Sequence, residues 1–415
     1  ETEDVLRAAV ARLGVETEWG VRLTGVEQDP DGVRLRLTGA DGVERSADSP
    51  WLIGCDGGHG TVRELLGLDL LDETGGRWML ADAPAGTGLP PDTLHWTRTS
   101  WTSVCAARRS TVPRMGEGRV FLAGNAAPVD SPAAGHAMNT GVQEAYNLAW
   151  KLAQVEQGHA GRELLDTYGQ ERAPAGRARR RSRRTPASAH RSGRLLVAPA
   201  LSVVLALLWA LPALRRTVQR RLLGGLSGLR TDYDASSLTT VESYEHVAGI
   251  GPVLLAGTVA TPLPVAGERI TAARIHDPDA PGCRALHGEL RDPRWSLLLA
   301  AGGTGPGDVP VGVAVTAAVQ YAEWLSVRTV GGHLPAEPGP LADPDGALRA
   351  ALGLAPGCWL LVRPDGYVAT RGAELTRTVL DHAFAPLRPR SPLIGAAPRE
   401  PGIVLPAPNR RPEEH

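Results

Sequence analysis

Residues 118–153, GRVFLAGNAAPVDSPAAGHAMNTGVQEAYNLAWKLA, contain an apolar strand, a loop rich in small residues and a long helix. The strand, RVFLAG, ends at Asn125, and from 139 to 158 apolar side chains recur at helical spacing. In doubly wound α/β proteins, ligands bind outside the carboxyl ends of such strands, where a helix N-terminus offers free N–H groups. The stretch therefore indicates a ligand-binding strand–loop–helix unit, with a purely structural turn as the alternative.

A second stretch of the same kind precedes it. The apolar run PWLIG leads into CDGGHGTVRELLG, so that Asp56 and Gly57 follow a buried strand and a helix begins near Thr61. Glycine allows the backbone to approach a ligand closely, and Arg63 can add a charge-assisted contact to an anion. A strand–glycine–helix turn with no ligand is the alternative here too.

Composition limits the function classes. The 415 residues suffice for two or three domains, and a formal net charge of −1 gives no basic field for nucleic acid. Lys151 is the only lysine, which we ascribe to the codon usage of a GC-rich genome. The four cysteines are far apart and form no CxxC, which favours neither a zinc site nor a disulfide framework. A cytoplasmic location is the simplest prediction.

Outside these two stretches the pattern predicts helices and strands in alternation. The N-terminal part predicts a helix at 3–13 and strands at 20–28 and 32–39, joined by a tight turn, Asp29 to Gly32, in which Gly is available for a positive φ. The C-terminal part predicts strand-like segments at 295–303 and 313–330, a hairpin at 358–372 turning at Pro364-Asp365-Gly366, and helices at 346–354 and 374–387. Such alternation is typical of a compact α/β domain.

Two segments in the middle leave alternatives open. An arginine run at 177–184 predicts a solvated helix end, or a site for anionic lipid or nucleic acid. The apolar run at 195–214 is long enough to cross a bilayer and is followed by two arginines. A buried or interfacial helix is the favoured interpretation, and a membrane span is the alternative.

Taken together, residues 55–63 and 118–153 resemble the FAD-dependent aromatic hydroxylases, the single-component group A flavoprotein monooxygenases. The sequence LLVRPDGYVATRG at 360–372 also resembles the C-terminal thioredoxin-like domain of the phenol-hydroxylase and polyketide-tailoring branch. The resemblance implies an α/β fold with an incomplete FAD-binding Rossmann-like domain, a helical connector and a thioredoxin-like α/β domain. The expected boundaries are 1–176 for the first domain, with a shortened substrate sheet at 69–117, 177–250 for the connector, 251–405 for the thioredoxin-like domain and 406–415 for a loose tail.

The resemblance also implies an activity. In this family NADH or NADPH reduces FAD, O2 adds to the reduced flavin, and oxygen is inserted into a small aromatic substrate; the cofactor carries the chemistry. The expected partners are this substrate and a second copy of the chain in a homodimer, with no nucleic acid and no metal. By resemblance the cofactor-binding residues are Asp56, Gly57, Arg63, Gly124, Asn125, Pro132, Gly135, Met138 and Asn139, and no catalytic residue is assigned.

The chain departs from the family pattern at several of these positions. Asn125 stands where the family has an aspartate, Pro128 where it has a histidine, and Ala134 and Ala137 where it has glycines; Gly60 replaces a serine. No GxGxxG segment occurs in the chain, and the stretch 69–117 is short for a substrate sheet. Because the chain begins with Glu1, a GxGxxG unit upstream of it is one explanation. A non-catalytic descendant that acts as a scaffold or dimerisation partner is the alternative function.

Overall fold

A computed structural model of the protein describes residues 2–68, 71–78, 105–127, 137–173, 232–233, 236–239, 264–270, 281–300, 311–332 and 339–387. Three segments that the sequence analysis singled out lie outside these ranges: the arginine run at 177–184, the apolar run at 195–214 and the tail at 406–415. Within them, no helix is long and apolar enough to cross a membrane.

The N-terminal half contains three small sheets. The first is antiparallel and has the order β1 (Arg22–Gln28), β2 (Val33–Thr38), β3 (Glu44–Ser49). The second has the order β4 (Leu52–Gly54), β8 (Val120–Leu122), β7 (Gly116–Glu117), with β4 and β8 parallel. The third pairs β5 (Leu71–Trp78) with β6 (Cys105–Thr111).

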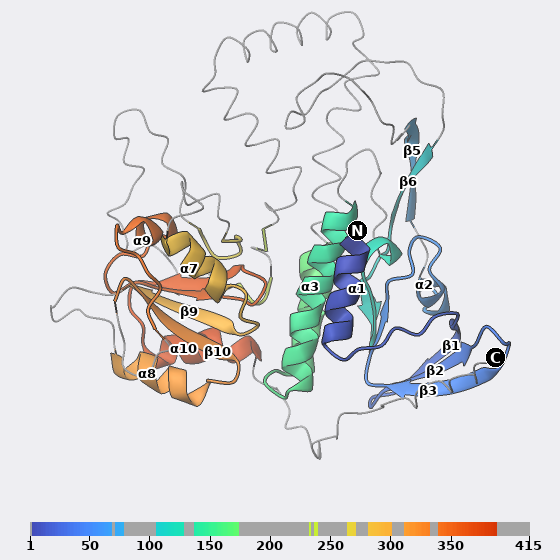
Figure 1. The fold of residues 1–415 in the computed structure, drawn as a ribbon, viewed down its shortest axis with the longest axis horizontal. Helices are drawn as coiled ribbons and strands as arrows, with labels where there is room; N and C mark the ends of the chain where they lie inside the picture. Colours follow the sequence, from blue (N-terminus) through green and yellow to red (C-terminus); the bar gives the residue numbers. More distant parts are fainter. Residues whose placement is uncertain are drawn as a thin grey trace, which may run out of the picture.

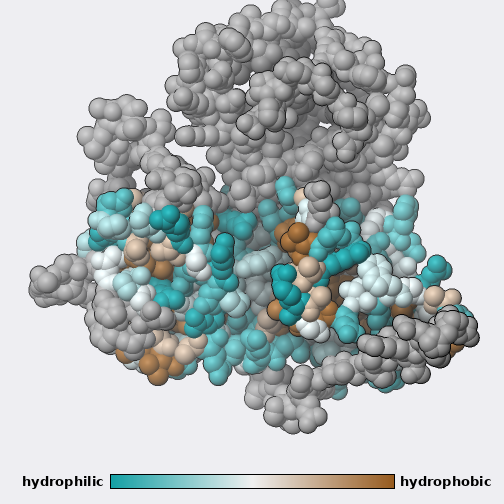
Figure 2. Space-filling view, viewed as in Figure 1, coloured by the Kyte–Doolittle hydropathy of each residue, from teal (hydrophilic) through white to brown (hydrophobic). Residues whose placement is uncertain are grey.

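Helices accompany these sheets. They are α1 (Thr2–Arg12), α2 (Thr61–Leu65), the 3₁₀ turn η1 (Gly124–Ala126), the long α3 (Ala137–Glu156) and η3 (Arg162–Leu165), which continues as a helix at 166–173. The predicted helices at 3–13 and 139–158 and the predicted strands of β1, β2, β4 and β8 are therefore confirmed. The apolar side chains of α1 are not buried: Val5, Leu6 and Val10 are exposed, as is Leu13 directly after the helix. Figure 2 shows the resulting apolar surface over this helix.

The tight turn between β1 and β2 forms by a different route than predicted. Gly32 does not adopt a positive φ. Instead, the carboxylate of Asp29 accepts hydrogen bonds from the backbone N–H groups of Asp31 and Gly32, at 2.7 and 2.9 Å. The side chain of the first turn residue thus supplies the closure that a left-handed glycine would otherwise provide.

The C-terminal half is a mixed four-stranded sheet with helices around it. Its order is β10 (Leu325–Val330), β9 (Trp295–Ala300), β11 (Trp359–Val362), β12 (Val368–Gly372), with only β10 and β9 parallel. The helices are α7 (Pro281–Glu289), α8 (Val311–Gln320), α9 (Ala347–Leu352), α10 (Arg377–Ala383) and η6 (Ala385–Leu387). The β11–β12 hairpin and the helices α9 and α10 agree with the sequence prediction.

The segment 313–330, predicted as strand-like throughout, is half helix. Its first part belongs to α8 and only its last part forms β10. Alanine has the highest helix propensity, and the buried Ala314 and Ala317 are three residues apart, on the face of α8 that packs into the core. The valines of this segment misled the prediction, because β-branched residues are enriched in strands although their context decides the outcome.

The two halves meet along α3, which lies between the C-terminal sheet and the N-terminal sheets (Figure 1). One hydrophobic cluster crosses the junction and joins Trp150, Ala160 and Leu164 to the strands β9 and β11. The indole rings of Trp150 and Trp295 meet edge to face, with centroids 5.7 Å apart. The halves are therefore held by a shared core and not only by the chain between them.

A buried charge cluster lies within this junction. The carboxylate of Glu171 accepts hydrogen bonds from both terminal nitrogens of Arg363, at 2.6 and 2.8 Å, and from Lys151 Nζ at 2.7 Å. Asn147 and Ser236 donate to the same carboxylate, at 2.7 and 2.6 Å. Glu171 and Lys151 are 0% exposed, so every one of these bonds lies away from solvent.

The turn of the β11–β12 hairpin completes the cluster. Asp365 accepts hydrogen bonds from Arg363 at 2.7 and 3.0 Å, and from Asn147 and Trp150 at 3.1 Å each. Two carboxylates thus face two cations, Lys151 and Arg363, which compensates the cost of burying each charge. Burial lowers the pKa of Lys151 to about 8, although Glu171 beside it acts in the opposite direction. Burial alone would raise the pKa of Glu171, but Arg363 and Lys151 hold it well below its ordinary value.

We expect Glu171→Gln to lower the free energy of unfolding by about 3–5 kcal/mol, because it leaves the Lys151 ammonium buried without a carboxylate partner. Urea denaturation at neutral pH measures the change. The control is Asp48→Asn, which breaks an ion pair with Arg34 whose side chains are 71% and 64% exposed and should cost less than about 1 kcal/mol. Equal effects of the two substitutions would contradict the account.

Candidate functional site

The predicted site residues occupy the carboxyl ends of two neighbouring parallel strands. Gly54 of β4 pairs with Leu122 of β8, and the backbone N–H of Ala123 donates to the Gly54 carbonyl at 3.0 Å. Asp56 and Gly57 leave β4 at the same edge at which Gly124 and Asn125 leave β8. The structure therefore brings the two sequence motifs together, at the kind of strand edge where ligands bind in doubly wound folds.

Two glycines at this edge have backbone conformations that other residues rarely adopt. Gly57 has φ +82° and Gly124 has φ +63°, and a Cβ placed on either would meet no atom of the described residues within 4 Å. Both backbones are therefore open toward a ligand as well as left-handed. On the other side of Gly124, a Cβ on Gly141 would lie 3.3 Å from its Cα, so the absence of a side chain at 141 lets α3 approach the turn.

Asp56 and Arg63 make contacts within their own turn and helix. The Asp56 carboxylate accepts a hydrogen bond from the Val62 N–H at 2.9 Å, at the start of α2. Arg63 is 8% exposed and donates to the Leu68 carbonyl at 2.9 Å. The position of Gly60 allows the first arrangement, because a Cβ there would lie 2.3 Å from the Asp56 carboxylate. A cofactor contact by either residue stays a prediction.

The second motif contributes exposed groups. Asn125, in the η1 turn, and Met138 and Asn139, in the first turn of α3, are all exposed. Pro132 and Gly135 lie outside the described residues. These side chains are thus accessible at the edge of the sheet and at the beginning of the helix that follows it.

Glu144, which the sequence analysis did not identify, holds the Gly124 turn in place from the interior of the protein. Glu144 of α3 accepts a hydrogen bond from the Gly124 N–H at 2.9 Å, and Arg172 lies 3.6 Å from its other oxygen. Both side chains are 1% exposed. The available signal was weak, because Glu144 is one of several buried polar residues of α3, with Asn147 and Lys151. The thiol of Cys55, close by, has its pKa raised by burial and by the carboxylates of Asp56 and Glu144, so it stays protonated.

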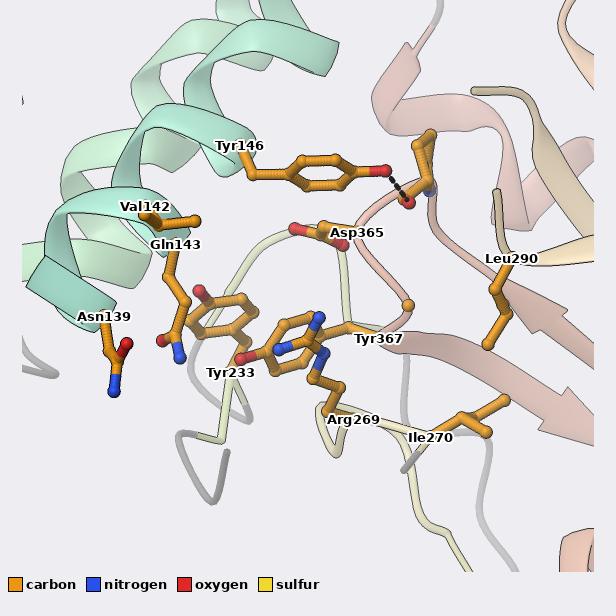
Figure 3. A pocket seen from close by; sticks show the side chains of 12 residues that line it. Asn139, Val142, Gln143, Tyr146, Tyr233, Arg269, Ile270, Leu290, Asp365 and Tyr367 are labelled. Carbon is orange, nitrogen blue, oxygen red and sulfur yellow. Dashed lines mark hydrogen bonds between the residues drawn. The ribbon is translucent and has the colours of Figure 1, made fainter. Parts of the chain in front are cut away.

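Beside this edge a cleft separates α3 from the C-terminal half (Figure 3). It has a volume of 460 Å³. Asn139, Val142, Gln143 and Tyr146 line it from one face of α3, at spacings of three and four residues. Tyr233, Arg269 and Tyr367 line it from the other side.

Comparisons with known proteins agree with this geometry. A family model described as FAD binding domain matches residues 1–91 and 91–182. The 6-methylpretetramide 4-monooxygenase of Streptomyces rimosus is 36% identical over 91% of this chain and 73% of its own length. The structure of CabE, an aromatic hydroxylase from angucycline biosynthesis, is 26% identical with a TM-score of 0.58, covering 93% of this chain and 80% of CabE. The anhydrotetracycline hydroxylase OxyS from Streptomyces rimosus is 25% identical with the same TM-score, over 93% of this chain and 78% of OxyS.

The fold and the glycine-lined strand edge therefore define a flavoprotein of the α/β class. The chain belongs to the FAD-dependent aromatic hydroxylases, which are monooxygenases and thus oxidoreductases. FAD is its cofactor, and NADH or NADPH is the reductant typical of the family.

Three buried tyrosines near the site should remain protonated in alkaline solution. Burial raises the pKa of Tyr168, Tyr233 and Tyr367 above 10. Above pH 10 the unfolded chain releases these protons and the folded chain keeps them, so the unfolded state binds fewer protons and stability falls as the pH rises. We expect urea unfolding at pH 11 to release a burst of phenolate absorbance. Complete phenolate formation before unfolding would contradict this.

Proposed function

We propose that the chain hydroxylates a phenolic substrate of the polyketide type, using FAD, NAD(P)H and O2. The observation that carries the proposal is the strand edge at which Gly57 and Gly124 are both left-handed and, among the described residues, no atom lies within 4 Å of where their Cβ atoms would be. The names of relatives support the substrate class, since one is a 6-methylpretetramide monooxygenase and another an angucycline hydroxylase.

The residues at this edge fit a flavin. The Asn125 carboxamide both donates and accepts hydrogen bonds, so it can hold a ribityl hydroxyl where the family has an aspartate. The first N–H groups of a helix have no partner within the helix itself, so the first turn of α3 can offer N–H groups to the polar edge of a ring. Glu144 holds the Gly124 turn in place from within the protein. When bound, FAD supplies the oxygen-transfer chemistry, and the protein orients the ring and excludes water.

The first test is the visible absorption spectrum of the purified chain, before and after FAD is added and the excess removed by desalting. Retained flavin absorbance, followed by NAD(P)H oxidation that depends on a tetracyclic phenol, is the expected result. A protein that never retains FAD would contradict the proposal. The alternative, a non-catalytic scaffold or dimerisation partner, would then account for the fold, and sedimentation velocity would test for the homodimer.

We expect Asn125→Ala to weaken FAD binding by about tenfold, because it removes a hydrogen bond without disturbing the core. Equilibrium dialysis against FAD measures the change. Asn125→Asp should retain or improve the affinity, because a carboxylate accepts hydrogen bonds from the same hydroxyl. The control is Gln157→Ala, at an exposed polar residue beyond the far end of α3. An affinity for FAD that is unchanged in Asn125→Ala would remove Asn125 from the site.

A further inference from the structure

The cleft between α3 and the C-terminal half combines a cation with aromatic surfaces. Its volume of 460 Å³ lies within the range of about 300–1,000 Å³ that is usual for small-molecule sites. It lies on the side of α3 that faces β11 and β12, so it is separate from the strand ends of β4 and β8. Asn139 of the second motif and the predicted hairpin turn Pro364-Asp365-Gly366 line it, but neither was interpreted as part of such a cleft.

Arg269 gives the cleft its charge. Its side chain is half-buried, and within the described part of the chain no hydrogen bond or ion pair to its guanidinium is found. The only carboxylate that lines the cleft, among the residues described, is that of Asp365, which is already engaged by Arg363, Asn147 and Trp150. The guanidinium therefore remains available to an anion.

The position of Arg269 is fixed by the hairpin beneath it. Its backbone pairs with Tyr367 in an antiparallel bridge, and the next residue, Ile270, donates its N–H to the Gly366 carbonyl at 2.8 Å. The guanidinium carbon lies 5.9 Å from the centre of the Tyr367 ring, within the range of a cation–π contact. Tyr367 is in turn stacked on Tyr233, with ring centroids 4.1 Å apart. The two stacked, buried tyrosine rings therefore form one wall of the cleft and hold the Arg269 guanidinium against it.

The opposite wall is aromatic and apolar. Tyr146 of α3 is 46% exposed, and its hydroxyl donates to the Pro364 carbonyl at 3.1 Å, which holds the ring across the cleft (Figure 3). Val142 lies one turn earlier on the same face, with Ile270 and Leu290 opposite. Asn139 and Gln143 add amides that donate and accept hydrogen bonds. A flat ring system with an acidic group matches this combination of surfaces.

We propose that this cleft binds a planar aromatic acid or phenolate, with its ring system against Tyr146 and its anionic oxygen toward Arg269. The ligand is of the same chemical class as the proposed substrate, and in that respect the inference extends the proposed function. The cleft begins at Asn139, in the first turn of α3, and so lies next to the proposed flavin edge. It is a second site for aromatic compounds that needs no bound flavin.

The test is a titration of the full chain, without FAD, with 3-hydroxy-2-naphthoate. The fluorescence of the ligand measures its binding. We expect saturable binding, and weaker binding of the neutral 2-naphthol. Arg269→Gln should lower the affinity for the naphthoate by about tenfold and leave that for 2-naphthol unchanged, because only the anion uses the cation. Arg269→Lys should restore part of the preference.

Two bulky substitutions locate the ligand. Val142→Trp should abolish binding of both compounds by filling the cleft, since Val142 is 58% exposed and faces it. The matched control, Val319→Trp, places the same side chain at a 69% exposed position on α8 and should bind normally. Asn125→Ala should also bind normally, which separates this site from the flavin site.

Absence of naphthoate binding by the unmodified chain would overturn the proposal. So would normal binding by Val142→Trp, or an anion preference that survives Arg269→Gln. Failure of the chain to retain FAD would leave this result unaffected, so the two proposals can fail separately.

Discussion

The Glu171 carboxylate is the point on which the two halves of the structure depend. It receives Lys151 from α3 and Arg363 from the end of β11, while its own helix belongs to the N-terminal half. Each of these groups would be costly to bury alone, and together they are compensated. The hydrophobic core around Trp150 and Trp295 supplies attraction between the halves, but it is not directional. The charge cluster adds direction, because a bidentate arginine–carboxylate pair tolerates little rotation.

Through this cluster α3 becomes a shared element. Near its beginning, Glu144 holds the Gly124 turn at the strand edge. Further along, Asn147, Trp150 and Lys151 contact the carboxylates of the junction. A third face, with Val142 and Tyr146, lines the cleft. The orientation of the proposed flavin site relative to the C-terminal sheet is therefore set by contacts of one continuous helix.

Local patterns in the sequence predicted much of this arrangement. The strands β4 and β8 are recognisable as short apolar runs, and the motifs that follow them were each interpreted as ligand-binding turns; their adjacency at one sheet edge is a finding of the structure. Prediction failed where a contact depends on residues far apart in the chain. Lys151, Glu171 and Arg363 carry no shared pattern, and the lone lysine was ascribed to codon usage although the structure gives it a buried partner. Likewise, alanines and valines alone could not separate α8 from a strand, because burial against the core decided the outcome.

The burial of Lys151 has a practical consequence. Since it is the only lysine in the chain, a lysine-specific protease has a single internal cleavage site, and that site lies at the junction of the two halves. Cleavage after residue 151 requires the helix to leave its partners, so the rate at which two fragments appear reports how often the halves separate. Separation of the two halves can therefore be measured by proteolysis of the natural chain, without any engineered label.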